Sequence, residues 1–269
     1  MKFDDLDAKM RVFETALDFC VLPEMHMVAR LDGRSFTRLT KEKQNFEAPF
    51  DERFRDLMVA TAEHLMDCGF RMVYGYTESD EISLLFHRDE QQFQRKLRKL
   101  NSVLAGEASA KFSLLLGDVA CFDCRISQLP NVELVCDYFR WRSADAARNA
   151  LNGHCYWLLR KQGLDVKAAT DQLRGMSSSA KHELLFGHGI NFNDLPNWQK
   201  RGVGLYWEQF EKTGTNPVTG QAVVAQRRRI KQDFDLPMKD DYGRFIADLA
   251  WGRRKLMRSQ VSVPATACQ

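Results

Sequence analysis

Two apolar runs meet at an acidic turn in the stretch YGYTESDEISLLFH, which spans Tyr74–His87. Both runs have the β-branched and aromatic composition of strands, so the stretch predicts a β-hairpin. The turn carries Ser79, Asp80 and Glu81, and two interpretations of these residues are open. It is either a solvated hairpin turn, which tolerates acids, or half of a metal site that needs a second carboxylate from elsewhere in the chain.

The pattern around this hairpin predicts an α+β fold. Residues 25–32 alternate between the two faces of a strand. Apolar residues recur at helical spacing over residues 51–68 and 90–116, and residues 119–129 return to strand character. The order strand, helix, two strands, helix, strand is typical of an antiparallel sheet of the split βαβ type, and we expect helices to cover one face of it. Helices are expected to follow at about 140–162, 165–174 and 178–186.

The strand at residues 25–32 ends at Asp32, which a split βαβ sheet would place near the hairpin turn. Asp32 and Asp80, with the accessible carbonyl of Gly33, form a set of hard oxygen ligands suited to Mg²⁺, whose other positions water and substrate phosphates fill. Two such ions would stabilise the attacking and leaving oxygens of a phosphoryl transfer. Adjacent strand residues point to opposite faces, so we expect Asp80 to face Asp32 and Glu81 to support the site.

A basic helix offers a complement to the acidic turn. Arg95 and Lys99 lie four residues apart in the helical pattern of residues 90–116, so they are expected on one face, where they could bind a triphosphate. A solvated charged face is the plainer interpretation of the same residues. The paired acids favour phosphate binding. Together these residues predict a metal-dependent enzyme of nucleotidyl transfer.

Positive charge is concentrated in the last quarter of the 269 residues. From Lys200 onward the chain has 13 Lys/Arg against 7 Asp/Glu, although the formal net charge of the whole chain is only +3. The excess includes basic runs at Arg227–Arg229 and Arg253–Arg258. The first run follows the turn-rich segment TGTNPVTG, which predicts a hairpin. A basic segment of this kind indicates either a polyanionic partner or a solubilising surface.

These patterns predict three regions: a catalytic core at 1–138, a helical segment packed on it at 139–200, and a basic hairpin with a tail at 201–269. The final residues, SVPATACQ, are expected to be disordered. Seven cysteines, an odd number, favour reduced thiols over a disulfide framework. No run approaches the ~18 apolar residues of a membrane span, and the N-terminus is unlike a signal peptide. We therefore expect a cytoplasmic protein with no membrane partner.

Six motifs resemble those of one known family. In chain order they are RLDGRSFTRLTK, SDEISLLF, FDCR, DYFRWRSADAARN, SSSAKHELLF and GINFNDLP. The same order is seen in the tRNA(His) guanylyltransferases and their bacterial and archaeal like-proteins, and the resemblance runs from about Met25 to Lys212. It implies a sheet of the polymerase-palm (ferredoxin-like) type. It also implies an enzyme that adds nucleotides to the 5′ end of tRNA, so that the RNA grows from 3′ to 5′.

The resemblance further implies how such a site works. The tRNA 5′-monophosphate is activated by ATP or GTP, and the 3′-hydroxyl of the incoming nucleotide then attacks the activated end. Phosphoryl transfer of this kind depends on positioning and charge neutralisation. Asp32 and Asp80 would hold two Mg²⁺ ions together with the Gly33 carbonyl. Family members are commonly homotetramers.

The motifs and the basic hairpin together assign further residues. Those expected to cradle the nucleotide are Asp32, Gly33, Arg34, Ser35, Phe36, Thr37, Ser79, Asp80, Arg95, Lys96 and Lys99. Those expected near the RNA are Arg125, Arg148, Asn149, Lys181, Asn191, Arg227, Arg228 and Arg229. Salt bridges and caps within the fold are an equal alternative for several of these residues taken singly.

Two positions depart from the family pattern. Enzymes dedicated to tRNA(His) carry a His-Ile-Asn-Asn-Leu-Tyr-Asn run after the WRxxD motif, and Ala147 stands here in place of the histidine. This departure resembles the like-proteins, which repair truncated tRNA 5′ ends by base pairing against the opposite strand. Ala48 stands where the eukaryotic pattern usually has a lysine before the proline, which leaves one phosphate contact unsupported.

Two other functions remain open from the sequence. A palm-fold nucleotide cyclase would share the paired aspartates, but it needs no RNA and leaves the basic C-terminal segment unexplained. A non-catalytic tRNA-binding protein descended from the enzyme is the second alternative. The presence of both Asp32 and Asp80 argues against it.

Overall fold

An open antiparallel sheet of six strands forms the centre of the molecule, in the order β4-β1-β3-β2-β5-β6. The structure is a computed structural model that describes residues 2–215 and 220–252. The strands are β1 (His26–Gly33), β2 (Met72–Glu78), β3 (Glu81–Phe86), β4 (Phe122–Leu129), β5 (Val203–Thr215) and β6 (Ala222–Asp233). Every neighbouring pair is antiparallel. The predicted α+β fold around an antiparallel sheet is confirmed.

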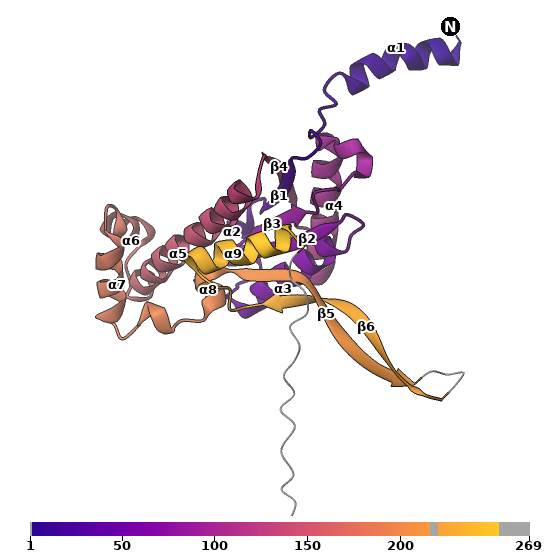
Figure 1. Ribbon diagram of the computed structural model, residues 1–269. Coiled ribbons are helices and arrows are strands. Elements are labelled where there is room, and N and C mark those ends of the chain that lie inside the picture. Colours follow the sequence, from indigo (N-terminus) through magenta and orange to yellow (C-terminus); the bar gives the residue numbers. More distant parts are fainter. Residues whose placement is uncertain (1, 216–219, 253–269) are drawn as a thin grey trace, which may run out of the picture.

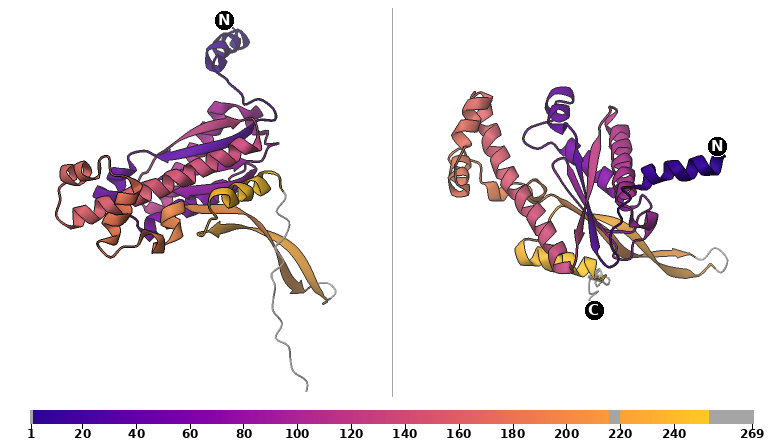
Figure 2. Two further views of the ribbon diagram at one scale, coloured as in Figure 1. Left: turned by 60° about the vertical axis from the view of Figure 1, so that its left-hand side comes forward. Right: turned by 90° about the horizontal axis from the view of Figure 1, so that it is seen from above.

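Helices cover both faces of this sheet (Figure 1 and Figure 2). The helices α3 (Glu52–Met66) and α4 (Leu97–Leu116) share one apolar core with the sheet. The helices α5 (Val132–Lys161) and α9 (Lys239–Ala250) share a second core with its other face. The prediction that helices cover only one face is therefore wrong.

The burial of β1 gives the physical reason for this difference. Met27 and Ala29 belong to the core under α3 and α4, whereas Val28 belongs to the core under α5 and α9. Val28 and Ala29 are both fully buried. Because adjacent strand residues point to opposite faces, a strand with apolar side chains on both needs cover on both. Val28 is the apolar residue among His26, Arg30 and Asp32 on its face, and it is the signal in the sequence for this second core.

Shorter elements complete the described part of the chain. They are α1 (Phe3–Thr15), α2 (Phe36–Arg38), a π turn (Leu39–Lys43), two 3₁₀ turns (Gln92–Arg95 and Phe192–Asp194), α6 (Val166–Leu173), α7 (Ser178–Phe186) and α8 (Asn197–Arg201). The C-terminal half of α5 extends beyond the sheet and forms a third apolar core with α6 and α7 (Figure 1). Helix α1 stands away from the rest of the described molecule (Figure 1 and Figure 2).

Helix α5 begins earlier than the sequence pattern predicted. Its first residue is Val132, not a position near 140. Asn131 caps the helix, since its side chain accepts a hydrogen bond from the backbone N–H of Leu134 at 2.9 Å. Val135 and Phe139 are buried against the sheet. Asn131 is a favoured N-cap residue type, and it is the sequence signal that would have placed this start.

The predicted basic hairpin is confirmed as β5 and β6, which pair from Gly204 and Asp233 to Thr215 and Ala222. The first part of β5 also pairs with β2. The sheet thus continues past the predicted boundary at residue 200, and the three predicted domain ranges stay predictions. The turn at residues 216–219, the basic run at residues 253–258 and the tail SVPATACQ lie outside the described residues.

Helix α9 follows the hairpin and was not predicted. It packs on α5 through the buried residues Tyr242, Phe245, Ile246 and Leu249. Their helical spacing is the signal in the sequence that indicates this helix.

Six of the cysteines lie in the described ranges and are free thiols. Within those ranges, no helix combines the length and apolar character needed to cross a membrane.

Asp51 caps the start of α3. Its carboxylate accepts hydrogen bonds from the backbone N–H groups of Glu47 and Arg53, both at 2.7 Å. It also pairs with the Arg53 guanidinium at 2.6 Å. The Arg53 side chain and these N–H groups lower the pKa of Asp51 to about 2.

Replacing Asp51 with alanine is expected to lower the free energy of unfolding by about 1–2 kcal/mol at neutral pH, because the cap is lost. The folded-state pKa of about 2 lies below the unfolded value of about 3.9. The ionised cap therefore stabilises the fold fully above pH ~4, and this contribution is lost as the pH falls through about 2. Urea unfolding at several pH values measures the difference between the two proteins, with Glu52→Ala as the control. A difference that stays constant as the pH falls would contradict this account.

Candidate active site

The turn between β2 and β3 gathers several carboxylates. Glu78 and Glu81 are Cα partners across the hairpin, and Ser79 and Asp80 form its two-residue turn. Ser79 has a φ of 50°, in the left-handed region that such hairpin turns use. The Thr77 hydroxyl donates a hydrogen bond to the backbone carbonyl of Glu81 at 2.9 Å. The hairpin predicted over residues 74–87 is confirmed, and its turn is held in a defined conformation.

Strand β1 brings Asp32 beside this turn. Asp32 and Glu81 are Cα partners, and the backbone N–H of Gly33 donates to the carbonyl of Asp80 at 3.0 Å. The structure therefore brings Asp32 and Asp80 together, as the sequence predicted. The expectation that Glu81 faces away from Asp32 is wrong, because directly opposed residues of an antiparallel pair share one face.

Gly33 is needed where β1 ends. A Cβ at this position would lie 2.5 Å from the ring of Phe36. Phe36 is itself buried and packs against Phe112 and Phe122, with ring centroids 5.0 and 4.9 Å apart. The aromatic core thus anchors the segment that follows Asp32, and the Phe36 ring serves this core as well as the site to which the motifs assign it.

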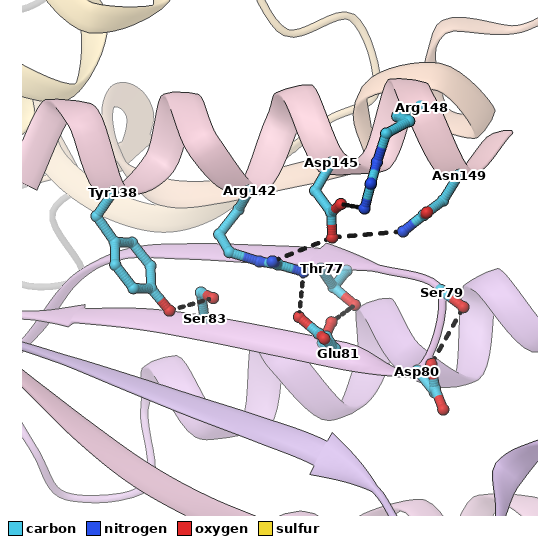
Figure 3. Close-up of polar contacts among 10 residues, drawn as sticks. All are labelled: Thr77, Ser79, Asp80, Glu81, Ser83, Tyr138, Arg142, Asp145, Arg148 and Asn149. Carbon is cyan, nitrogen blue, oxygen red and sulfur yellow. Dashed lines mark hydrogen bonds and ion pairs between the residues drawn. The ribbon is translucent and has the colours of Figure 1, made fainter. Parts of the chain in front are cut away.

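Arg142 of α5 connects the helix to the acidic turn (Figure 3). Its guanidinium donates to the Glu81 carboxylate at 2.5 Å and to the Asp145 carboxylate at 3.2 Å. The Arg142 side chain is only 4% exposed, and that of Glu81 is 23% exposed. Asp145 also accepts hydrogen bonds from Arg148 and Asn149. A chain of charged contacts therefore holds Glu81 against α5.

Carboxyl groups are crowded at this turn. Burial, reinforced by repulsion from Glu81, raises the pKa of Glu78 to about 8. Burial also raises the pKa of Asp80, with a further contribution from Asp32. For Glu81, burial raises the pKa against the attraction of Arg142. It is therefore unfavourable for these groups to be ionised together, and a bound cation would favour their charged forms.

A cavity of about 400 Å³ lies beside the acidic turn. Its walls are the residues 77–81, the loop 46–51 and one face of α5, which contributes Asn149, Gly153 and Trp157. Lys41 also lines it, with its ammonium 5.3 Å from the centroid of the Trp157 ring. The volume is that of a small-molecule site. One end of the cavity is acidic, and aromatic side chains line much of the rest.

Two family models match this chain. Residues 7–130 match the model described as tRNAHis guanylyltransferase, and residues 133–240 match the one described as Thg1 C terminal domain. The chain is 34% identical over 209 residues to the tRNA(His) guanylyltransferase of Schizosaccharomyces pombe, a match that covers 71% of this chain and 80% of the relative. This chain belongs to the tRNA(His) guanylyltransferase family. The expected enzyme class, a nucleotidyltransferase acting on tRNA, is confirmed.

Two solved structures share this fold. Both are described as a bacterial tRNA(His) guanylyltransferase (Thg1)-like protein, one in complex with ATP and one in complex with GTP. They align with TM-scores of 0.74 and 0.70, each at 26% identity. The alignments cover 91% and 92% of this chain and 98% and 99% of those chains. The palm-type sheet implied by the family motifs is confirmed.

The residues that the family motifs assign to the nucleotide occupy different surroundings. Phe36, Thr37, Ser79 and Asp80 line the cavity. Arg34 and Ser35 are exposed just after β1. These residues stay candidates for nucleotide binding, since they lie on the segments that meet at the acidic turn.

Arg95, Lys96 and Lys99 do not form the shared helical face that the sequence predicted. The turn before α4 has left-handed φ values of 51°, 55° and 59° at residues 93–95, so the helix begins only at Leu97. Arg95 is buried and donates to the carbonyl of Met25 at 2.6 Å. Lys96 pairs with Asp18 at 2.8 Å, whereas Lys99 is exposed. The prediction that Arg95 and Lys99 share one face is therefore wrong.

The residues expected near RNA are spread over several elements. Arg148 and Asn149 lie on α5, where both donate to Asp145 (Figure 3), and Asn149 also lines the cavity. Lys181 of α7 donates to Asn152 of α5 at 2.9 Å. The others are placed as follows: Arg125 on β4, Asn191 capping the turn before α8, and Arg227, Arg228 and Arg229 on β6. The structure thus brings some of them to the active site and leaves the arginines of β6 on the projecting hairpin.

Sequence reasoning missed the roles of Arg142 and Asp145. Both lie in the motif DYFRWRSADAARN, three residues apart and hence on one helical face. That spacing predicts a contact between the two residues, but it does not reveal the contact to Glu81, which lies 61 positions away in the sequence.

Proposed function

We propose that this chain catalyses templated 3′–5′ addition of nucleotides to the 5′ end of tRNA. The observation that carries the proposal is the meeting of Asp32 and Asp80 beside a cavity of about 400 Å³ on a palm-type sheet. The related bacterial structures in complex with ATP and GTP support nucleoside triphosphates as ligands. In our proposal the cavity receives the nucleotide, and its phosphates lie toward the acidic turn.

The donor set at the turn fits Mg²⁺. The described residues contain no group of three or more His, Cys, Asp or Glu side chains placed to hold a metal ion. Mg²⁺ does not need such a group, because it takes one or two carboxylates and fills the remaining positions with water and substrate phosphates. Asp32, Asp80 and the Gly33 carbonyl would supply these protein ligands. Two ions bound there would neutralise the phosphate charge and stabilise the attacking and leaving oxygens.

Neighbouring residues would keep these ligands in place. The Ser79 hydroxyl donates to the Asp80 carboxylate at 3.1 Å. Arg142 holds Glu81, whose backbone is paired with that of Asp32. Glu81 therefore acts in our proposal by orienting the two strands that carry the ligands. Asn149, which lines the cavity, is placed to contact the nucleotide or the RNA end.

The template strand of the tRNA would supply the sequence information. Ala147 stands in this chain where dedicated tRNA(His) enzymes have a histidine, and the neighbouring Arg148 and Asn149 contact Asp145. If base pairing chooses the nucleotide, the protein need only bind RNA by its backbone and shape. We therefore propose repair of truncated tRNA 5′ ends as the main activity, with ATP or GTP as activator.

The projecting hairpin is proposed to bind the tRNA backbone. The Arg228 guanidinium lies 4.3 Å from the centroid of the Trp207 ring, whereas Arg229 pairs with Glu208 at 2.8 Å. Changing Arg227 and Arg228 to glutamate should weaken binding of every tRNA by about tenfold or more, because phosphate contacts do not depend on sequence. Lys167→Glu in α6 combined with Arg174→Glu, which directly follows that helix, makes the same change in net charge elsewhere.

Filter binding with several tRNAs at two salt concentrations tests this prediction. The hairpin variant should also show a weaker dependence of binding on salt, by about 0.7–0.9 in the log–log slope per lost contact. Loss of binding for a single tRNA species, with the others unaffected, would contradict the proposal.

We further propose that the chain is cytoplasmic, as its composition indicates, and that it works as a homotetramer, as the family resemblance implies. A nucleotide cyclase, the alternative function, would leave the hairpin arginines unexplained, whereas membership of a tRNA-modifying family accounts for them.

The proposed function is tested by incubating the chain with a 5′-monophosphorylated tRNA that lacks its first nucleotide, with Mg²⁺, ATP and all four nucleoside triphosphates. Incorporation is expected. Tight tRNA binding without incorporation would instead identify a non-catalytic RNA-binding protein.

A further inference from the structure

Helix α1 carries an apolar stripe that no other described residue covers. The helix stands away from the sheet in each view (Figure 1 and Figure 2), and none of its residues is buried. The exposed fractions of the stripe range from 47% to 79%, and its members are Phe3, Leu6, Met10 and Phe13. A separate helix of 13 residues is only marginally stable in water. Contact with a partner surface would bury the stripe and stabilise the helix.

The spacing of the stripe is that of a coiled coil. Its intervals are three, four and three residues, which places its members alternately at a and d positions of a heptad, beginning with Phe3 at a. Val12 is a further apolar residue of the helix and is 65% exposed, but it lies outside the stripe. This spacing allows a second helix to cover the stripe along its whole length.

The charges beside the stripe select the partner and its direction. Lys2 and Lys9 occupy g positions, and Asp7 and Glu14 occupy e positions. In a parallel pair of identical helices, each g residue faces the e residue of the following heptad, so Lys2 meets Asp7 and Lys9 meets Glu14 of the other copy. An antiparallel pair would instead set lysine against lysine and acid against acid. Asp7 also contacts Arg11 in its own helix, an exposed pair that contributes little.

We propose that α1 pairs with α1 of a second copy of this chain as a parallel two-stranded coiled coil. The pairing removes both apolar stripes from water and matches the charges on either side of them. It goes beyond the proposed homotetramer, because it assigns one interface, its residues and its direction. A tetramer in which α1 stays unpaired would leave the proposed function intact and would overturn this inference.

Sedimentation equilibrium of the full chain over a range of concentrations tests the pairing. Met10→Asp places a charge at a central a position and should raise the dissociation constant between copies at least about tenfold. Val12→Asp adds the same charge to the same helix outside the stripe and should leave association unchanged. Equal association of Met10→Asp and the unaltered chain would overturn the proposal. So would unchanged association with a lower free energy of unfolding, because the stripe would then pack on its own subunit.

A charge exchange tests the direction. Lys9→Glu sets glutamate against Glu14 of the other copy in a parallel pair, so it should weaken association. Adding Glu14→Lys to this variant restores opposite charges and should restore association. In an antiparallel pair, Lys9→Glu would instead relieve repulsion between lysines. Stronger association of the Lys9→Glu variant would therefore overturn the parallel arrangement.

Discussion

Replacing Asp32 or Asp80 with alanine is expected to reduce nucleotide addition about a thousandfold or more. A metal ion supplies several kcal/mol of transition-state stabilisation in phosphoryl transfer, and each ~1.4 kcal/mol corresponds to about a factor of ten in rate. Neither side chain belongs to an apolar core. Burial raises the pKa of Asp80 and repulsion from Asp32 adds to it, so removing one carboxylate relieves unfavourable charge. The fold should therefore be retained.

The rate of nucleotide addition and the free energy of unfolding are measured together for these variants. Asp89→Ala removes an exposed carboxylate beyond the far end of β3 and serves as the control. A ligand role also predicts a change in metal preference: Asp80→Cys should recover part of its activity with a thiophilic ion such as Cd²⁺, and little with Mg²⁺. If both alanine variants add nucleotides at the rate of the unaltered chain, nucleotidyl transfer does not take place at Asp32 and Asp80.

Replacing Arg142 with methionine is expected to lower the free energy of unfolding by about 3–5 kcal/mol, because it leaves the Glu81 carboxylate partly buried without its partner. The contact is short, at 2.5 Å, and the Arg142 side chain is almost fully buried. Combining this change with Glu81→Gln removes the unpaired charge and should recover much of the loss. The difference between the double variant and the two single variants measures the coupling.

Urea unfolding measures these free energies. Arg140→Met is the matched control, since Arg140 lies on the same helix and its contacts to Asp137 and Asp240 are exposed. It should change the stability by less than about 1 kcal/mol. If Arg142→Met is no more destabilising than Arg140→Met, the contact between Arg142 and Glu81 contributes little to the free energy of unfolding.

The features that local patterns predicted correctly are those that depend on neighbouring residues. The alternation of residues 25–32 and the two runs around the acidic turn predict strands, and the order of the elements then places Asp32 beside Asp80. The basic hairpin follows from the same kind of local signal, a turn-rich segment between two extended runs. These features needed no knowledge of distant contacts.

The features that were wrong or missing depend on contacts between distant segments. Arg95 and Lys99 were expected on one helical face. The left-handed turn at residues 93–95 contains Arg95, and α4 begins only after it, at Leu97. This turn contains none of the glycine or asparagine residues that usually indicate such a conformation. The pairing of Arg142 with Glu81 is set by how α5 crosses the sheet, which spacing along the chain does not reveal.

The measurement that tests the account most directly is the identity of the nucleotide added to truncated tRNA. The chain is incubated with Mg²⁺, ATP, all four nucleoside triphosphates and a 5′-monophosphorylated tRNA that lacks its first nucleotide, prepared in four versions with each base at the opposite position. If addition is templated, the added nucleotide changes with the opposite base and pairs with it each time. Addition of guanosine to tRNA(His) alone, whatever base lies opposite, would contradict templated repair.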